Sequence, residues 1–274
     1  MTGAAIPVPR GWLELRETAD AAARSRELVD RLRDHLPDGG LTVVHDLACG
    51  TGAMGRWLAP QLRGPQCWIL HDWDTRLLHA AETDPPGGAA DGAAVTVEPR
   101  HSDITRLAID DLTGASLITA SALLDLMTSS ELDGLIALCA GAGCPVLLTL
   151  SVVCSVLLAP ADGLDQQVAA AFDAHQRRVT PRGRLLGPDA VAAAVDGFGR
   201  PGADVLLRTS PWHLGPAEAT LAAEWLAGWL DAACEQEADL VGERDRYERR
   251  RLSEAGAGRL RVTVDHADLL VLPR

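Results

Sequence analysis

Three glycines and one acidic residue form the part of this sequence whose residue types and spacing are most suited to chemistry. Gly50, Gly52 and Gly55 follow a short β-branched, apolar run, and Asp46 precedes the first glycine by four positions. A helical pattern begins after the glycines. A strand, a glycine turn and a helix in this order bring backbone N–H groups close to a negatively charged ligand group, because glycine has no Cβ to block the approach. The segment therefore predicts a cofactor site.

Two interpretations of this turn must be separated. Gly50-x-Gly52-x-x-Gly55 matches the dinucleotide fingerprint, and Asp72 lies about 20 residues further on, where an acid that binds ribose is expected. The fingerprint alone is weakly specific. It predicts an oxidoreductase that uses a nicotinamide cofactor.

The longer string 46–52, Asp-Leu-Ala-Cys-Gly-Thr-Gly, resembles the first motif of class I S-adenosylmethionine-dependent methyltransferases, which reads acid, apolar, Gly, any, Gly, any, Gly. Ala48 stands where that family has its first glycine. In the family, the acid at the position of Asp46 helps to hold the ammonium end of the methionine moiety, whereas it would repel a pyrophosphate. We therefore favour the methyltransferase interpretation.

The resemblance implies roles for four further residues. Asp72 would accept hydrogen bonds from both ribose hydroxyls, with Asp74 as the rival for this role, and Trp73 would pack on the adenine ring. Asp103 would accept from the adenine amino group while Ile104 closes over the ring. The alternative for Asp103 is the N-cap of the segment that follows it.

Other positions of the expected cofactor site come from the turn and from neighbouring segments. An N-terminal helical segment often covers the cofactor in this family, so Arg16 or Arg24 would reach the methionine carboxylate. Ser121 or Asp125 would face the methyl donor, and the alternative for Asp125 is the cap of a helix turn. The full expected cofactor site is Arg16, Asp46, Ala48, Cys49, Gly50, Gly52, Asp72, Trp73, Asp103, Ile104 and Ser121.

Methyl transfer from a sulfonium needs mainly in-line positioning, and a general base helps if the acceptor is a hydroxyl or a protonated amine. Imidazole titrates near neutral pH, so the candidate bases are His175, His213 and His101. His175 is preferred because the region after the fifth strand often faces the acceptor in this family. No group of acids and histidines has the spacing of a metal site.

Alternating strand and helix patterns predict an α/β fold with a doubly wound, mostly parallel, seven-stranded sheet of the Rossmann-like methyltransferase type. We expect a tail and helical cap over residues 1–40 and a methyltransferase domain over residues 41–274. The fifth strand is predicted at 145–153, and the last at 262–272 with a break near His266. A helical insertion over about 216–258 is expected to precede that last strand.

The composition excludes several classes of protein. The net charge is −13 and the sequence contains no lysine, which opposes nucleic-acid binding, although an RNA methyltransferase stays open. No apolar run is long enough to cross a membrane, and no signal peptide is recognisable. Six cysteines without a C-x-x-C pair predict a reduced, cytoplasmic protein without structural zinc, and the arginine-only usage suggests a bacterial source.

Together these observations predict an S-adenosylmethionine-dependent methyltransferase that acts on a small-molecule acceptor by O- or N-methylation. The alternatives are a nicotinamide-dependent oxidoreductase and a non-catalytic cofactor-binding protein of the same fold. The sequence leaves open the acceptor, the methylated atom and whether the chain forms a homodimer.

Overall fold

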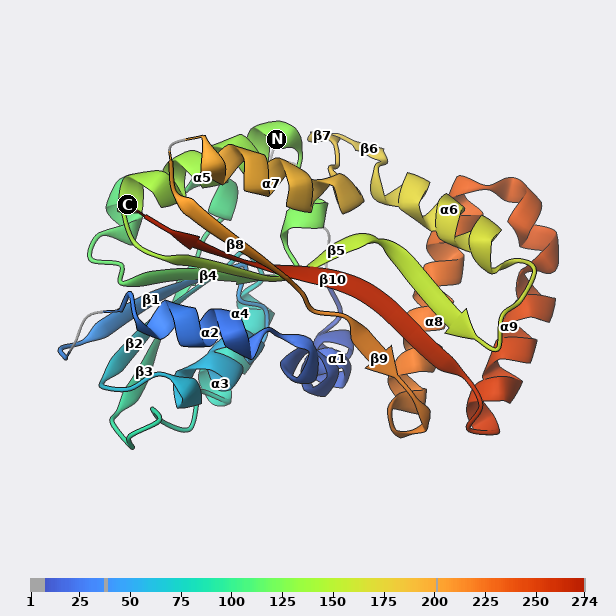
Figure 1. Ribbon diagram of the computed structural model, residues 1–274, viewed down its shortest axis with the longest axis horizontal. Helices are drawn as coiled ribbons and strands as arrows, with labels where there is room; N and C mark the ends of the chain where they lie inside the picture. Colours follow the sequence, from blue (N-terminus) through green and yellow to red (C-terminus); the bar gives the residue numbers. More distant parts are fainter. Residues whose placement is uncertain (1–7, 37–38, 201, 274) are drawn as a thin grey trace.

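An eight-stranded, mostly parallel sheet with helices on both faces forms the centre of the protein (Figure 1). The computed structural model describes residues 8–36, 39–200 and 202–273. Seven strands lie in the order β3-β2-β1-β4-β5-β10-β8, and β9 pairs with β10 beside this path. The strands are β1 Thr42–Leu47, β2 Gln66–Asp72, β3 Val95–His101, β4 Leu117–Ser121, β5 Val146–Ala159, β8 Asp204–Thr209, β9 Trp212–Leu214 and β10 Arg261–Leu272.

β1 lies at the point where the strand order reverses. It pairs in parallel with β2 on one side and with β4 on the other. Because consecutive strands are added outward from β1 in both directions, the carboxyl ends of β1 and β4 border a crevice, the usual ligand position in doubly wound sheets. The fold therefore places the segments after β1, β2 and β4 at one edge of the sheet.

The predicted fold class is confirmed, but the sheet has eight strands rather than seven. The additional strand is β9, whose Trp212 and Leu214 pair with Val264 and Val262 of the antiparallel β10. The break expected near His266 is present as a register shift between Val264 and His266. The division of the chain at residue 40 stays a prediction.

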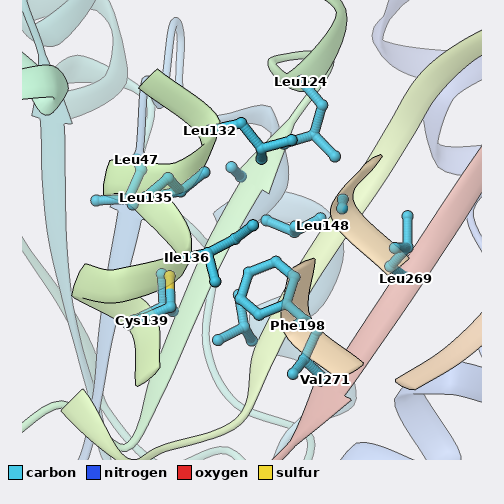
Figure 2. Close-up of a cluster of buried hydrophobic side chains, with 14 of the residues drawn as sticks. Leu47, Leu124, Leu132, Leu135, Ile136, Cys139, Leu148, Phe198, Leu269 and Val271 are labelled. Carbon is cyan, nitrogen blue, oxygen red and sulfur yellow. The ribbon is translucent and has the colours of Figure 1, made fainter. Parts of the chain in front are cut away.

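Two helical layers cover the main sheet. α2 (Arg26–Arg33), α3 (Ala53–Leu58) and α4 (Thr75–Thr83) share one buried cluster with β1, which includes Leu28, Leu32 and Val44. α5 (Ser129–Ala142) and α7 (Ala190–Gly199) cover the opposite face, where Ile136 and Phe198 pack between the helices and the sheet (Figure 2). No helix among the described residues has the length and apolarity to cross a membrane.

β5 and β10 extend well beyond the main sheet, to the right in Figure 1. The fifth strand was expected to end at Val153, but it continues to Ala159 because it pairs with the first half of β10. α6 (Asp165–Gln176) and the inserted helices α8 (Ala219–Gln236) and α9 (Val241–Gly256) pack on this extension. The tryptophan stripe of α8, Trp225 and Trp229, lies in this core.

α1 (Arg10–Ala23) crosses the edge at which the expected site lies. It is attached on one side by an ion pair between Glu17 and Arg56, with 2.6 Å between Oε2 and Nη2. On the other side, the indole N–H of Trp212 donates to Asp20 Oδ1 at 3.0 Å. These contacts connect α1 both to the helix after the glycine turn and to the strand extension.

Asp268 joins three segments behind this helix. Its carboxylate accepts hydrogen bonds from the backbone N–H groups of Ser25 and Leu150, at 2.7 and 2.8 Å, and from the Ser210 hydroxyl at 2.6 Å. The side chain is fully buried, and burial raises its pKa. Asp268 therefore fixes the start of α2 against β5 and the segment after β8.

We expect Asp268→Asn to lower the free energy of unfolding by about 2–4 kcal/mol, because an amide turns an N–H₂ group toward buried donors. Urea unfolding followed by circular dichroism measures the change. Asp265→Asn, on the same strand, serves as the control and should change stability by less than about 0.5 kcal/mol. Equal effects of the two substitutions would contradict the role of Asp268.

Candidate functional site

The glycine turn after β1 has the tight backbone that the sequence predicts. Gly50 and Gly52 have positive φ values of 56° and 81°. A Cβ on Gly52 would lie 3.1 Å from Ala81 Cβ, and one on Gly50 would lie 3.1 Å from Leu13 Cδ1 of α1. Both positions therefore favour glycine, and α1 lies directly over the turn.

The N–H groups of this turn are not arranged for a phosphate, which corrects the expectation from the sequence. Gly50 N donates to Asp72 Oδ2 at 2.9 Å, Cys49 N donates to the His71 carbonyl, and Gly52 N donates to the Cys49 carbonyl. The helix that follows, α3, has only six residues. A pyrophosphate would have to compete for donors that the protein already uses, and this opposes the dinucleotide interpretation.

Two buried groups of opposite charge lie next to the turn without pairing with each other. Asp46 Oδ1 accepts from the Thr119 hydroxyl at 2.8 Å, while its Oδ2 is buried and has no hydrogen-bond partner among the described residues. Burial raises the pKa of Asp46 to about 7, although the hydrogen bond from Thr119 acts in the opposite direction. Asp46 therefore has an unsatisfied oxygen suited to a cationic donor.

Arg24 supplies the opposite charge. Its Nη2 donates to Ser121 Oγ at 3.0 Å and its Nε to Thr149 Oγ1 at 3.4 Å, and the guanidinium lies over the Trp57 ring. Nη1 is buried and has no partner in the described part of the chain. Burial lowers the pKa of Arg24, and Asp46 is among the acids that act to raise it. The two unsatisfied atoms thus match the ammonium and carboxylate of an α-amino acid.

Of the two arginines considered from the sequence, Arg24 is the one next to the turn. Arg16 pairs instead with Asp20, at 2.9 Å, and its guanidinium stacks over Trp212 at 4.9 Å and Trp12 at 5.9 Å. The sequence did not separate the two residues because both lie on the same helical segment. Ser121 is brought to the site through its bond with Arg24.

Asp72 lies at the end of β2, beside the turn. Its two oxygens accept from the backbone N–H groups of Gly50 and Asp74, each at 2.9 Å. A carboxylate has further lone pairs, so Asp72 can still accept from ribose hydroxyls. Asp74, the rival, pairs with Arg76 and caps α4 instead. The Trp73 side chain is 40% exposed and is free to cover a flat ring.

Asp103 forms the capping contact that the alternative interpretation expects. Its Oδ1 accepts from both the backbone N–H and the hydroxyl of Thr105, at 3.0 and 2.7 Å. Ile104, the next residue, packs partly against the core near α5. Asp103 Oδ2 lies 3.5 Å from Arg106 Nε, so both oxygens of this carboxylate have partners, and the adenine role of the two residues stays a prediction.

Three non-glycine residues with left-handed backbone lie along this edge. Ala48, Ala122 and Leu150 have φ values of 53°, 52° and 55°, the first two directly after β1 and β4 and the third within β5. Such conformations cost about 1–3 kcal/mol each and cluster at functional sites. Their positions coincide with the crevice that the strand order creates.

Asp125 is a second buried carboxyl group, in the short helix that follows β4. Its Oδ1 has no partner among the described residues, and the residue is 6% exposed. Burial raises the pKa of Asp125 to about 6, while Arg16 and Arg178 act to lower it. Asp125 forms no ion pair with either arginine among the described residues.

The three candidate histidines are not brought together. His175 Nε2 lies 3.1 Å from Glu235 Oε2 of α8, and burial lowers the pKa of His175. His101 Nε2 lies 2.9 Å from the Trp73 carbonyl. His213 is exposed beside Thr263, on the opposite face of β9 from Trp212. None of the three contacts Ser121 or Asp125 through a described hydrogen bond. Their catalytic role stays a prediction that this geometry does not favour.

A buried histidine pair joins β1 and β2 directly before Asp46 and Asp72 in the chain. His45 Nδ1 lies 3.0 Å from His71 Nε2, and the rings stack with centroids 5.3 Å apart. Burial lowers the pKa of both imidazoles to about 4. Both rings are therefore neutral near pH 7 and belong to the packing of β1 on β2.

Neither thiol nor metal chemistry is supported at the turn. The Cys49 thiol donates to the Gly50 carbonyl at 3.6 Å, and burial raises its pKa well above the usual value. Within residues 8–36, 39–200 and 202–273, no group of three or more His, Cys, Asp or Glu side chains could hold a metal ion. Cys49 is therefore a packing residue beside the site.

Comparisons with known proteins give similarity at the level of solved structures. No model of a known protein family and no curated protein matches the chain. A methyltransferase from Geobacter sulfurreducens, crystallised with S-adenosyl-L-homocysteine, has a TM-score of 0.48 and 18% identity, with 98% of this chain and 100% of that chain covered. A methyltransferase from Thiobacillus denitrificans, also with S-adenosyl-L-homocysteine, has a TM-score of 0.45 and 18% identity, with 98% of this chain and 100% of that chain covered. The cyclopropane synthase MmaA2 from Mycobacterium tuberculosis has a TM-score of 0.45 and 13% identity, with 89% of this chain and 82% of that chain covered.

Ala48→Gly tests whether the backbone of the turn is strained. Glycine adopts a positive φ without the Cβ clash, so we expect the free energy of unfolding to rise by about 1 kcal/mol despite the greater freedom of the unfolded chain. Chemical unfolding at pH 7.5 measures the change. Ala53→Gly, in the adjacent helix α3, is the matched control and should destabilise the protein by a similar amount. Destabilisation by both substitutions would contradict the strain at Ala48.

Proposed function

We propose that the chain is an S-adenosylmethionine-dependent methyltransferase acting on a small-molecule acceptor by O- or N-methylation. The observation that supports this function is the unpaired couple of buried charges, Asp46 and Arg24, at the carboxyl edge of the sheet. A zwitterionic amino-acid end supplies an ammonium to Asp46 Oδ2 and a carboxylate to Arg24 Nη1. No part of a dinucleotide carries both charges in this arrangement.

The remaining cofactor residues follow from their positions around the turn. Asp72 accepts from the ribose hydroxyls and Trp73 covers the adenine. Gly50 and Gly52 have no Cβ, which leaves room for the cofactor to approach the backbone. Asp103, which also pairs with Arg106, and Ile104 border the far end of the nucleoside. S-adenosylmethionine supplies an activated methyl group when bound, so the chain itself needs to orient the acceptor, exclude water and accept a proton.

We assign to Asp125 the role of the general base that accepts the proton of the acceptor. Asp125 follows β4, it is buried, and Oδ1 has no competing partner in the described residues. A base that titrates near pH 6 is ionised at neutral pH and still basic enough to receive a proton from an amine or a hydroxyl. His175 and His213 lack this combination, because one is held by Glu235 and the other faces away from α1.

The proposed function predicts how cofactor affinity depends on pH. Below pH 7 Asp46 becomes protonated in the free protein and must lose this proton to hold an ammonium, so affinity falls as the pH falls. We expect the affinity for S-adenosylhomocysteine, measured by titration calorimetry, to be at least about tenfold weaker at pH 5.5 than at pH 7.5. Asp46→Asn should weaken binding at pH 7.5 and flatten this dependence.

Two arginine variants and a second nucleotide complete this experiment. Arg24→Gln should weaken S-adenosylhomocysteine binding at least about tenfold, because a charge-assisted hydrogen bond is lost, while Arg16→Gln should have a smaller effect. NAD should give no heat. Binding of NAD in preference to S-adenosylhomocysteine would refute the proposed function, and an intact affinity in Asp46→Asn would refute the assigned site.

The second prediction concerns Asp125. With an acceptor found by screening hydroxyl, amine and carboxylate compounds for S-adenosylhomocysteine release, we expect kcat to rise with pH up to about 6 and then to level off. Asp125→Asn should lower kcat by about 10²–10⁴-fold while S-adenosylhomocysteine affinity is kept. Asp133→Asn, an exposed acid on α5, is the control. An unchanged pH profile in Asp125→Asn would exclude Asp125 as the base.

A further inference from the structure

Arg178 is a guanidinium without a carboxylate partner in a chain of net charge −13. Most of the buried and half-buried arginines pair with an acid within 4.0 Å. These paired residues are Arg16, Arg56, Arg177, Arg182, Arg208, Arg244 and Arg251. Among the described residues of this kind, the two exceptions are Arg24 and Arg178. The first has been assigned to the cofactor, and the second needs another explanation.

The contacts of Arg178 leave one edge of its guanidinium available. Nη1 lies 3.2 Å from the His175 carbonyl at the end of α6 and 3.4 Å from His175 Nδ1. Nε and Nη2 form no hydrogen bond with the described residues. This Nε–Nη2 edge is the face that binds a carboxylate or a phosphate through two parallel hydrogen bonds.

Arg178 also lines a hollow beside α6 and the hairpin formed by β6 (Val179–Thr180) and β7 (Gly183–Arg184). Figure 1 labels these three elements. The volume of the hollow is about 650 Å³, enough for a small molecule. Arg177 and Arg184 line the same hollow, together with Asp173. Arg177 is bound to Asp189, so Arg178 and Arg184 give the hollow its positive character.

The segment that carries Arg178 borders the proposed reaction site. Leu186 N donates to the Met127 carbonyl at 2.8 Å, and Arg182 Nη2 donates to the Leu126 carbonyl at 3.1 Å. Arg178 acts on Asp125 electrostatically, although the two side chains form no ion pair. The segment 178–186 therefore adjoins the short helix that carries Asp125.

We propose that Arg178 binds an oxyanion, a carboxylate or a phosphate, carried by the methyl acceptor, so that the acceptor is an anionic small molecule. This inference rests on the proposed function. The oxyanion occupies the free edge of Arg178, Arg184 adds positive potential at the mouth of the hollow, and the acceptor nucleophile is directed toward Asp125. During transfer the nucleophile forms a bond to the methyl carbon, the carbon–sulfur bond breaks with its electron pair on sulfur, and the proton of the nucleophile passes to Asp125.

The experiment uses the full chain saturated with S-adenosylhomocysteine and inorganic phosphate as the probe. Phosphate binding is followed by the broadening of its ³¹P resonance. We expect saturable binding, at least tenfold weaker in Arg178→Gln, weakened by a smaller factor in Arg178→Lys and unchanged in Arg246→Gln, an exposed arginine of α9. No binding to the wild type, or equal binding to Arg178→Gln, would overturn the proposal.

Two further arms identify the source of the oxyanion. S-adenosylhomocysteine affinity in Arg178→Gln should equal that of the wild type, and a loss would assign Arg178 to the cofactor. Benzoate should displace phosphate while benzamide does not. Displacement by both, or much stronger displacement by a single-stranded RNA, would contradict a small anionic acceptor. Failure of S-adenosylhomocysteine to bind the wild type would instead refute the proposed function, and phosphate binding to Arg178 would still be measurable.

Discussion

The buried guanidinium of Arg24 is the constraint on which the arrangement of the site depends. A charge removed from water destabilises a protein unless polar groups replace the lost solvent. Two hydroxyls, Ser121 and Thr149, and the face of Trp57 surround Arg24, but none of these carries a negative charge. The protein therefore holds a cation at the end of β4 and beside Thr149 of β5, with only part of its solvation replaced.

This placement determines where the N-terminal helices lie. Arg24 is the C-cap of α1, and the following residue, Ser25, is the N-cap of α2 and donates its backbone N–H to Asp268. The junction between the helices is thus fixed to β4, β5 and β10 at once. With its end held there, α1 must cross the crevice, where Leu13 reaches Gly50 and Arg16 comes within electrostatic range of Asp125. One junction therefore positions the helix that lies over both the glycine turn and the segment after β4.

The sequence predicts the parts of this arrangement that depend on local patterns. Asp46 and Asp72 could be placed because each ends a strand, and parallel strands end at the same edge. The choice between Arg16 and Arg24 depends on contacts with residues about 100 positions away, such as Ser121, so no local pattern reveals it. No local pattern reveals that the N–H of Gly50 donates to Asp72, or on which face of β9 His213 lies.

Ion pairing separates the buried charge of Arg251 from those of Asp46 and Arg24, although each of the three has one buried atom without a hydrogen-bond partner in the described residues. Arg251, which is also fully buried, is paired with Asp165 and Glu254, as expected for a residue that stabilises the fold of α9. Asp46 and Arg24 have opposite charges and lie at the same edge of the sheet, yet they do not pair with each other. If their purpose were stability, direct contact would offset the loss of solvent for both groups. Their separation therefore costs stability in the free protein, and this cost is the basis of the proposal that a molecule with both charges binds there.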